Sequence, residues 1–412
     1  RTAEVRPEGR GLLKQAMAAA GLPVIDEAGY RDGGRLPAAF RDMDETGNPP
    51  RLRDYQQEAV DAFVSGGSGV VVLPCGAGKT WVGMGALVHL QCETLILTPN
   101  GTSVRQWIRE LTSRTTLTSA EVGAYTGERK EVRPVTVATY QVLTHRRSKS
   151  GPFLHRGLFM GREWGLIIYD EVHLLPAPVF RMTADLQATR RLGLTATLVR
   201  EDGRETDVFA LIGPKRYELP WRAVEGAGFI ARARCTEVRV PMDEETAARY
   251  AAAPRGERPR LAGENPRKAE AVRRLLERHA GEPTLIIGHY LDQLKKLAEI
   301  FSLPLVTGET PQAERQRLYD RFNRGEVRAL AVSKVANFAV DLPDASVAIQ
   351  VSGSFGSRQE EAQRLGRILR PKSSAASFYT VVSEGTVERE FSRKRRRFLL
   401  EQGYAYETEW WT

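Results

Sequence analysis

The feature that most constrains this chain is a glycine-rich segment, PCGAGKT at residues 74–80, which follows the apolar run 70–73. A strand, a glycine turn and a helix in this order point backbone N–H groups at phosphate, and the helix dipole adds positive field. Lys79 is then expected to reach the β and γ phosphates of a nucleotide, and Thr80 to offer its hydroxyl to Mg²⁺. The loop residues expected to line the phosphates are Gly76, Ala77 and Gly78.

A second motif, DEVH at residues 170–173, follows the apolar run 166–169. Its position predicts that Asp170 contributes to a metal site at the end of a strand, while Glu171 orients and deprotonates the attacking water. Together the two motifs favour a motor driven by nucleoside-triphosphate hydrolysis over a plain glycine turn and a solvated acidic pair. ATP and Mg²⁺ are therefore the expected cofactors.

Composition narrows the class of protein. A chain of 412 residues with 42% hydrophobic and 27% charged residues is typical of a globular protein of two or three domains, and the sequence has no apolar run long enough to span a membrane. We therefore expect a cytoplasmic location. The formal net charge of +9 favours a polyanionic partner, with nucleic acid the leading candidate. Only three cysteines are present, too few for a disulfide framework or an iron–sulfur cluster, and their spacing does not suit zinc.

Apolar, strand-like runs alternate with amphipathic segments from residue 52 onward, which predicts an α/β fold with mostly parallel sheets covered by helices. The first series of expected strands lies at 70–73, 94–98, 135–138, 166–169 and 192–195. A second series of this kind begins after residue 228, includes an expected helix at 359–369 and lacks a phosphate loop. We expect an extension over residues 1–50, lobes over 51–230 and 231–392, and a basic segment over 393–412. A short Arg- and Pro-rich stretch near 244–266 is expected to be a surface insertion.

The second lobe carries QRLGRILR at residues 363–370. Gln363, Arg367 and Arg370 are spaced by four and then three residues, which places them on one face of a helix. They are interpreted as part of the nucleotide site, with both arginines acting as arginine fingers on the γ phosphate. A solvated basic face is the alternative.

Other segments leave two interpretations open. Arg53 and Gln56 precede the phosphate loop, so Gln56 is a candidate for the adenine edge and Arg53 for packing on the ring. Thr195 and Thr197 end a strand and either connect the acidic site to a bound polymer or form a simple turn. The charged run of Arg200, Glu201 and Asp202 follows at the sheet edge where ligands of α/β folds gather, though such a run is also typical of a solvated turn.

Taken in order, the motifs LRDYQ, GAGKT, DEVH, LTATLVRED and QRLGRILR resemble those of XPB-type helicases of superfamily II, especially the bacterial homologues. The resemblance runs from about residue 52 to 404, and the Arg-Glu-Asp run is similar to the family's RED motif. It implies two RecA-like domains with the ATP site in the cleft between them, Mg²⁺-ATP hydrolysis, duplex DNA binding and 3′ to 5′ unwinding or translocation in nucleotide excision repair. It also implies that Arg200, Glu201 and Asp202 open DNA. The first 50 residues look too short for the family's complete damage-recognition domain.

The prediction is therefore an ATP-dependent DNA helicase and duplex translocase that acts on duplex or forked DNA, is favoured to be a monomer and has a repair nuclease as a partner. One alternative is a double-strand translocase that remodels protein–DNA complexes without unwinding. A second alternative is an ATP-gated scaffold that recruits a repair nuclease, because the sequence contains no nuclease constellation of its own.

Overall fold

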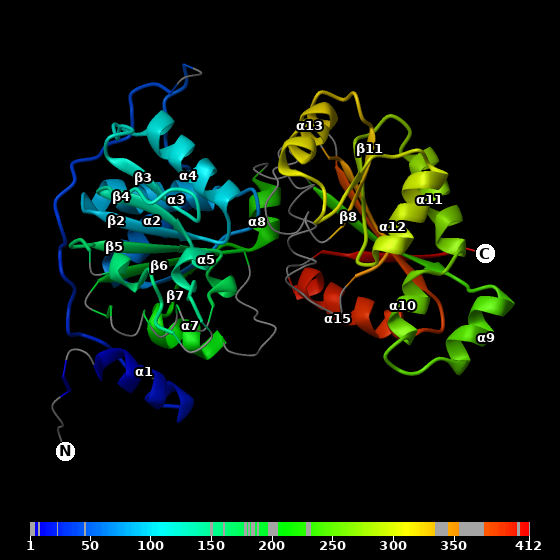
Figure 1. The fold of residues 1–412 in the computed structure, drawn as a ribbon, viewed down its shortest axis with the longest axis horizontal. Helices are drawn as coiled ribbons and strands as arrows, with labels where there is room; N and C mark the ends of the chain where they lie inside the picture. The colour runs from blue at the N-terminus through cyan, green and yellow to red at the C-terminus, as the bar shows by residue number, and fades with distance from the viewer. Residues whose placement is uncertain are drawn as a thin grey trace. The chain divides into compact units, whose positions relative to one another are not determined.

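The computed structural model describes residues 5–6, 9–22, 24–44, 47–148, 151–159, 161–176, 179, 182, 186–187, 189–196, 205–227, 232–333, 345–353, 375–401 and 404–411. The chain forms two compact units. The first holds Arg1–Pro74 and Gly78–Leu219, and the second holds Cys75–Ala77 and Pro220–Thr412. We describe each unit by itself (Figure 1).

The first unit is built on a sheet of seven parallel strands, in the order β3-β4-β2-β5-β6-β1-β7. Its inner strands read as continuous apolar runs because helices cover both faces of a parallel sheet. The strands are β1 (Gly69–Val72), β2 (Thr94–Thr98), β3 (Val122–Tyr125), β4 (Val135–Thr139), β5 (Leu166–Asp170), β6 (Arg190–Thr195) and β7 (Lys215–Glu218).

Helices α2, α3 and α4 pack against one another or the sheet, and α1 lies beside α7 (Figure 1). Capping residues define where two of these helices begin and end. The side chain of Asn100 accepts a hydrogen bond from the Ser103 amide at 3.0 Å and so caps α4, whereas α2 ends at Gly67 with φ of 70°. The helices are α1 (Arg10–Ala19), α2 (Asp54–Gly66), α3 (Lys79–Leu90), α4 (Gly101–Arg114), α5 (Tyr140–Leu143) and α7 (Glu205–Leu211), with short 3₁₀ turns η2 (Arg156–Phe159) and η3 (Val172–Leu174).

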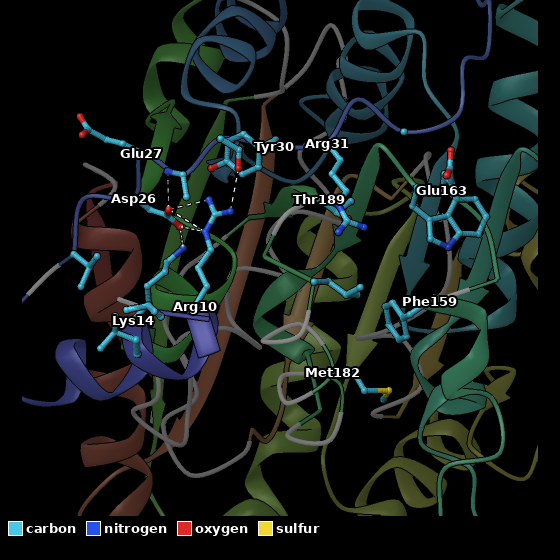
Figure 2. A pocket seen from close by; sticks show the side chains of 18 of the residues that line it. Arg10, Lys14, Asp26, Glu27, Tyr30, Arg31, Phe159, Glu163, Met182 and Thr189 are labelled. Carbon is cyan, nitrogen blue, oxygen red and sulfur yellow. Dashed lines mark hydrogen bonds and ion pairs between the residues drawn. The ribbon is translucent and has the colours of Figure 1, made fainter. Parts of the chain in front are cut away.

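The N-terminal segment is anchored to the first unit by charged side chains. Figure 2 shows Arg10 and Lys14 of α1 converging on Asp26, with N–O distances of 2.8 Å for each ion pair. Lys14 also donates to Gln187 at 2.8 Å, which ties the segment to residues far along the chain. Burial alone would raise the pKa of Asp26, but the hydrogen bonds from Arg10 and Lys14 outweigh it and lower this pKa to about 2.

The second unit is also built on seven parallel strands, in the order β10-β11-β9-β12-β13-β8-β14. Its strands are β8 (Ala233–Val240), β9 (Thr284–Ile287), β10 (Leu305–Val306), β11 (Ala329–Val332), β12 (Val347–Gln350), β13 (Ala376–Ser383) and β14 (Tyr406–Trp410). Its helices are α8 (Trp221–Gly226), α9 (Glu244–Ala252), α10 (Arg258–Gly263), α11 (Arg267–Arg278), α12 (Leu291–Ile300), α13 (Gln312–Asn323) and α15 (Val387–Glu401).

Two polar segments of the second unit are more structured than their composition suggests. The Arg- and Pro-rich stretch near 244–266 forms α9 and α10, and the buried Asn265 just beyond donates to the Pro241 carbonyl and the Ser383 hydroxyl, both at 3.1 Å. The basic run at 393–397 lies on α15, where Arg395 is buried. Ion pairs of Arg260 with Glu264 and of Lys394 with Glu390 offset part of the positive charge of these two segments.

The two parallel sheets confirm the predicted α/β fold class. The predicted strands at 70–73, 94–98, 135–138, 166–169 and 192–195 correspond to β1, β2, β4, β5 and β6, whereas the helix expected at 359–369 lies outside the described residues. Pattern reasoning missed the polar edge strands β7 and β14, which have one neighbour each and face solvent. Among the residues that the structure describes, none of the helices has the length and apolarity that a membrane span requires.

Candidate nucleotide-hydrolysis site

The predicted catalytic motifs meet at the carboxyl edge of the first sheet. β5 and β1 flank β6, and all three strands are parallel, so the residues that follow them emerge at the same edge. The phosphate loop follows β1, Asp170 ends β5 and Thr195 ends β6. Ligands of open α/β sheets bind outside this edge.

The phosphate loop depends on backbone conformations that favour glycine. Gly76 and Gly78 both have φ of 81°, and α3 begins directly afterwards at Lys79. A Cβ atom at Gly78 would come within 2.4 Å of Nε2 of Gln56. The loop therefore lies tightly against Gln56, and the N-terminus of α3 provides the N–H groups and dipole field that suit a phosphate.

Lys79 and Glu171 connect the two motifs directly. The Lys79 Nζ lies 3.2 Å from Oε1 of Glu171, and both side chains are largely buried. The backbone of Glu171 is in the left-handed region, with φ of 51° and ψ of 54°, where few non-glycine residues occur. Such strain is found preferentially at functional sites, where the surrounding structure holds the side chain in place.

Asp170 is held at both its side chain and its backbone. The indole Nε1 of Trp107 donates to Oδ2 of Asp170 at 2.9 Å, and the Tyr140 hydroxyl donates to the Asp170 carbonyl at 2.9 Å. Burial and then the neighbouring Glu171 carboxylate raise the pKa of Asp170 to about 6, against the opposing effects of Trp107 and Lys79. Two carboxylates in this environment favour a bound cation.

The last residue of the DEVH motif reaches the neighbouring strand. The Nδ1 atom of His173 shares a hydrogen bond with the Thr195 hydroxyl at 2.7 Å and lies 3.5 Å from Oε2 of Glu171. Thr195 is fully buried, and its hydroxyl connects β6 to the acidic motif, while a link from there to a bound polymer stays a prediction.

Arg53 and Gln56 lie at the start of α2, next to the phosphate loop. Oε1 of Gln56 accepts a hydrogen bond from the Arg53 amide at 2.9 Å, and the Arg53 guanidinium donates to the Tyr55 hydroxyl at 3.1 Å. This geometry orients the Gln56 amide, which is buried against Gly78. Recognition of adenine by these residues stays a prediction.

The donor set at this edge fits Mg²⁺ and a nucleotide. Thr80 supplies a hydroxyl in the first turn of α3 and Asp170 a carboxylate, and Mg²⁺ prefers a few such oxygens together with phosphate and water. A side chain at Gly78 would collide with Gln56, so glycine lets the loop lie close to that residue. The N–H groups at the N-terminus of α3 then suit a phosphate. Lys79, Thr80 and Asp170 are thus the residues that would hold Mg²⁺-ATP.

Seven predicted site residues lie outside the described residues. These are Thr197, Arg200, Glu201, Asp202, Gln363, Arg367 and Arg370. Their roles in DNA opening and in completing the nucleotide site stay predictions.

Sequence reasoning missed Trp107 and Tyr140. Both are buried and come from the α4 and α5 segments, 63 and 30 residues before Asp170. Gly83 of α3 makes room for the indole, because a Cβ there would lie 2.5 Å from the Trp107 ring. A single tryptophan on an amphipathic helix carries no signal of this contact, since only the folded sheet brings α4 beside β5.

A large cavity of about 1930 Å³ lies elsewhere in the first unit, between the N-terminal segment and residues that include Phe159, Met182 and Thr189 (Figure 2). Residues that precede β5 and β6, including Trp164 and Thr189, line it. It therefore lies toward the amino edge of the sheet and shares no residue with the catalytic motifs.

Comparison with known proteins matches this chain to two protein families and to relatives named as XPB helicases. The family model described as "ERCC3/RAD25/XPB C-terminal helicase" matches residues 224–409, and "Type III restriction enzyme, res subunit" matches residues 50–200. A "DNA 3'-5' helicase XPB" of Kineococcus radiotolerans is 59% identical, covering 98% of this chain and 71% of the relative. The protein of the same name from Mycobacterium tuberculosis is 56% identical, covering 98% and 73%. The Drosophila melanogaster "General transcription and DNA repair factor IIH helicase/translocase subunit XPB" is 39% identical, covering 86% and 47%.

Solved structures share the fold at low sequence identity. The Hef helicase domain of Pyrococcus furiosus superposes with a TM-score of 0.55 at 16% identity, covering 84% of this chain and 98% of that one. The ATP-dependent Type ISP restriction-modification enzyme LlaBIII, bound to DNA, gives a TM-score of 0.63 at 14% identity, covering 88% and 31%. These likenesses confirm the prediction of two RecA-like domains.

Proposed function

Because this chain belongs to the XPB family of DNA 3′–5′ helicases, it is an ATP-dependent DNA helicase, and we propose that the site at the carboxyl edge of the first sheet hydrolyses Mg²⁺-ATP to drive it. The observation that carries this proposal is the contact of Lys79 with Glu171 beside Asp170, at the edge of the sheet where the phosphate loop lies. It brings a phosphate-binding cation, a general base and a metal-binding carboxylate into one site.

Each residue has a distinct task in this proposal. Lys79, whose Nζ lies close to the Glu171 carboxylate, binds the β and γ phosphates. Glu171 orients the attacking water and accepts its proton, a role for which its constrained backbone and the nearby His173 fix the carboxylate. Thr80 and Asp170 would hold Mg²⁺, which would neutralise charge on the transferred phosphoryl group when bound. Gln56 and Arg53 are assigned to adenine, and Gln363, Arg367 and Arg370 to the γ phosphate side.

The helicase assignment is compatible with two activities on DNA, strand separation and translocation along a duplex. The bacterial relatives are named as DNA 3'-5' helicases, which favours strand separation, and the name of the Drosophila relative reads helicase/translocase, which is compatible with translocation along a duplex. We propose duplex or forked DNA as the substrate, nucleotide excision repair as the pathway and a cytoplasmic, nucleoid-associated location. A repair nuclease as partner and a monomeric state belong to the same proposal, and an ATP-gated scaffold for that nuclease is the alternative.

Glu171→Gln tests the chemistry. The variant should bind a fluorescent ATP analogue with near-normal affinity while its DNA-stimulated ATPase rate falls by about 10²- to 10⁴-fold, because the general base is lost. Glu58→Gln, on the exposed face of α2, is the matched control and should hydrolyse ATP at the wild-type rate. Normal hydrolysis by Glu171→Gln would overturn the mechanism.

The two modes separate in a second measurement with the wild-type protein. Unwinding of forked DNA and displacement of a third strand from a triplex are followed side by side, together with ATPase on each substrate. Unwinding with matched ATPase supports the helicase mode. Triplex displacement without unwinding supports translocation alone, and repair activity that survives in Glu171→Gln supports the scaffold.

A further inference from the structure

Strand β14 forms an open edge of the second sheet. Among the strands that the structure describes, β8 is its only neighbour. Edge strands of natural proteins are commonly kept short or carry lysine or proline, which prevents pairing with another chain. The sequence of β14, YETEW, contains neither lysine nor proline, whereas the opposite edge strand β10 has two residues and the edge strand β7 of the first sheet begins with Lys215. β14 therefore lacks these protections.

The backbone of β14 directs hydrogen-bonding groups away from the sheet. The Trp411 amide donates to the Arg239 carbonyl at 2.9 Å, so the backbone groups of Trp411 and of every second residue before it are directed toward β8. The N–H and C=O groups of successive residues point to opposite sides of a strand, which directs those of Thr408 and Trp410 away from β8. Both residues are exposed. These positions therefore suit the addition of an extended chain.

An aromatic ring is held in place at the same edge. Trp410 is 62% exposed, and the guanidinium carbon of Arg239 lies 4.5 Å from its ring centroid. The Nε atom of Arg239 donates to Glu237 at 2.8 Å, and the buried Glu237 accepts a further hydrogen bond from the Ser392 hydroxyl at 2.6 Å. The support beneath the ring is thus fixed by buried polar contacts. An exposed tryptophan on such a support is typical of the anchor residues of protein interfaces.

The other face of β14 is acidic. Side chains of a strand alternate between its two faces, so Glu407 and Glu409 share the face opposite to Trp410. The Arg278 guanidinium donates to both carboxylate oxygens of Glu409, at 3.0 and 3.1 Å, and so neutralises this carboxylate. Glu407 is exposed and belongs to none of the ion pairs among the described residues. The edge thus presents one uncompensated carboxylate together with a fixed aromatic ring.

We propose that β14 is a docking edge to which an extended segment of a partner protein adds as a further strand. The main-chain hydrogen bonds of the added strand supply affinity, and its alternate side chains supply specificity. The matching segment carries a basic residue opposite Glu407 and an aliphatic residue beside Trp410, because opposite charges and aromatic–aliphatic contacts across a strand pair are stabilising. This inference goes beyond the proposed function, since it concerns a protein partner and uses none of the residues assigned to nucleotide or DNA.

A second copy of this chain matches the edge less well. Antiparallel pairing of two β14 strands about Thr408 would place Glu407 of one copy opposite Glu409 of the other, on the same face of the joined sheet. Like charges directly opposite each other in a strand pair are destabilising. Charge complementarity therefore favours a basic strand from another protein.

The test uses the full chain and fluorescein-labelled peptides of about nine residues, a length typical of strands. One peptide alternates lysine with valine, and the other alternates glutamate with valine. Anisotropy titrations should show that the lysine–valine peptide binds the wild-type protein at least about 10-fold more tightly than the glutamate–valine peptide. The formal net charge of +9 on this chain opposes non-specific binding of a cationic peptide, so such a preference reports the local carboxylate.

Two variants locate the binding at the edge of the sheet. Thr408→Pro removes an N–H group that is directed away from β8 and leaves the ladder with β8 in place, so binding of the lysine–valine peptide should weaken by about 10-fold. Glu407→Lys should reverse the preference, so that the glutamate–valine peptide binds more tightly. Glu277→Lys makes the same charge reversal at an exposed position of α11 and, as the matched control, should keep the wild-type preference.

Melting temperature and sedimentation velocity complete the test. If Thr408→Pro lowers the melting temperature, the peptide preference of Glu407→Lys decides alone. The inference is overturned if the lysine–valine peptide does not bind the wild-type protein at about 1 mM, or if Glu407→Lys keeps the wild-type preference. A wild-type dimer that dissociates in Thr408→Pro would assign the edge to a second copy of this chain and would equally overturn the inference.

Discussion

The indole of Trp107 donates a hydrogen bond of 2.9 Å to the carboxylate of Asp170, from a ring that is only 1% exposed. Trp107 belongs to α4, and Gly83 of the phosphate-loop helix α3 leaves the space in which its ring packs. One side chain thus links α4, α3 and the carboxylate proposed to hold Mg²⁺. Groups that orient a metal ligand in this way tune metal affinity.

Trp107→Phe should therefore weaken the response to Mg²⁺. The variant keeps an aromatic ring but loses the donor to Asp170, and loss of such a supporting hydrogen bond costs about 10- to 100-fold in metal affinity or activity. The measurement is the Mg²⁺ concentration that gives half-maximal ATPase activity. Trp164→Phe is the matched control, because Trp164 is also buried and donates at 2.9 Å, to the Leu158 carbonyl away from the catalytic motifs. Equal Mg²⁺ responses in the two variants would assign Trp107 a packing role alone.

Arg367→Ala should slow ATP hydrolysis by on the order of 10³-fold while changing ATP affinity much less, because an arginine finger acts on charge that develops in the transition state. Steady-state ATPase and nucleotide-binding titrations separate the two effects. The same two measurements on Arg370→Ala test the second predicted arginine finger. An unchanged rate in Arg367→Ala would leave this arginine with a structural role.

Replacing Arg200, Glu201 and Asp202 together by Ala should reduce strand separation more than DNA-stimulated ATPase. The acidic pair would be repelled by phosphate, so a role in parting the strands suits this run better than a phosphate clamp. Fork unwinding, ATPase and melting temperature are measured on the same preparation, and the melting temperature should stay near that of the wild type. Equal losses of unwinding and ATPase would place the run in the coupling between them.

Lys268 and Glu388 form a buried ion pair in the second unit, with N–O distances of 2.7 and 3.0 Å. Burial lowers the pKa of Lys268, against the stabilising charge of Glu388. Lys268→Met should cost about 3–5 kcal/mol of unfolding free energy, because it leaves a carboxylate buried without its cation. Adding Glu388→Gln should recover most of this loss.

Chemical denaturation followed by tryptophan fluorescence measures these free energies. Lys215→Met, which breaks the exposed pair with Glu218, is the control and should change stability far less. A small effect of Lys268→Met on its own would show that the buried pair contributes little net stability.

How far the fold follows from sequence is clearest in the strands. The apolar runs that became β1 and β5 were predictable because strands buried on both faces are apolar along most of their length. The edge strand β7, with Lys215, Arg216 and Glu218, carries no such pattern and forms because it pairs with β1. The buried anchors Lys14 and Lys268 were equally unpredictable, since a lysine is buried only where a distant carboxylate supplies its partner.

The sequence by itself determined the chemistry, because phosphate binding and hydrolysis require particular residues at short, fixed spacings: Gly76 to Thr80 form one local turn, and Asp170 and Glu171 are adjacent. Only the tertiary structure decided what surrounds them. The parallel sheet brings Trp107, Tyr140 and Thr195 from separate elements to the DEVH motif, and packs Gln56 against Gly78. Such contacts depend on strand order and helix packing, which no local pattern of residues encodes.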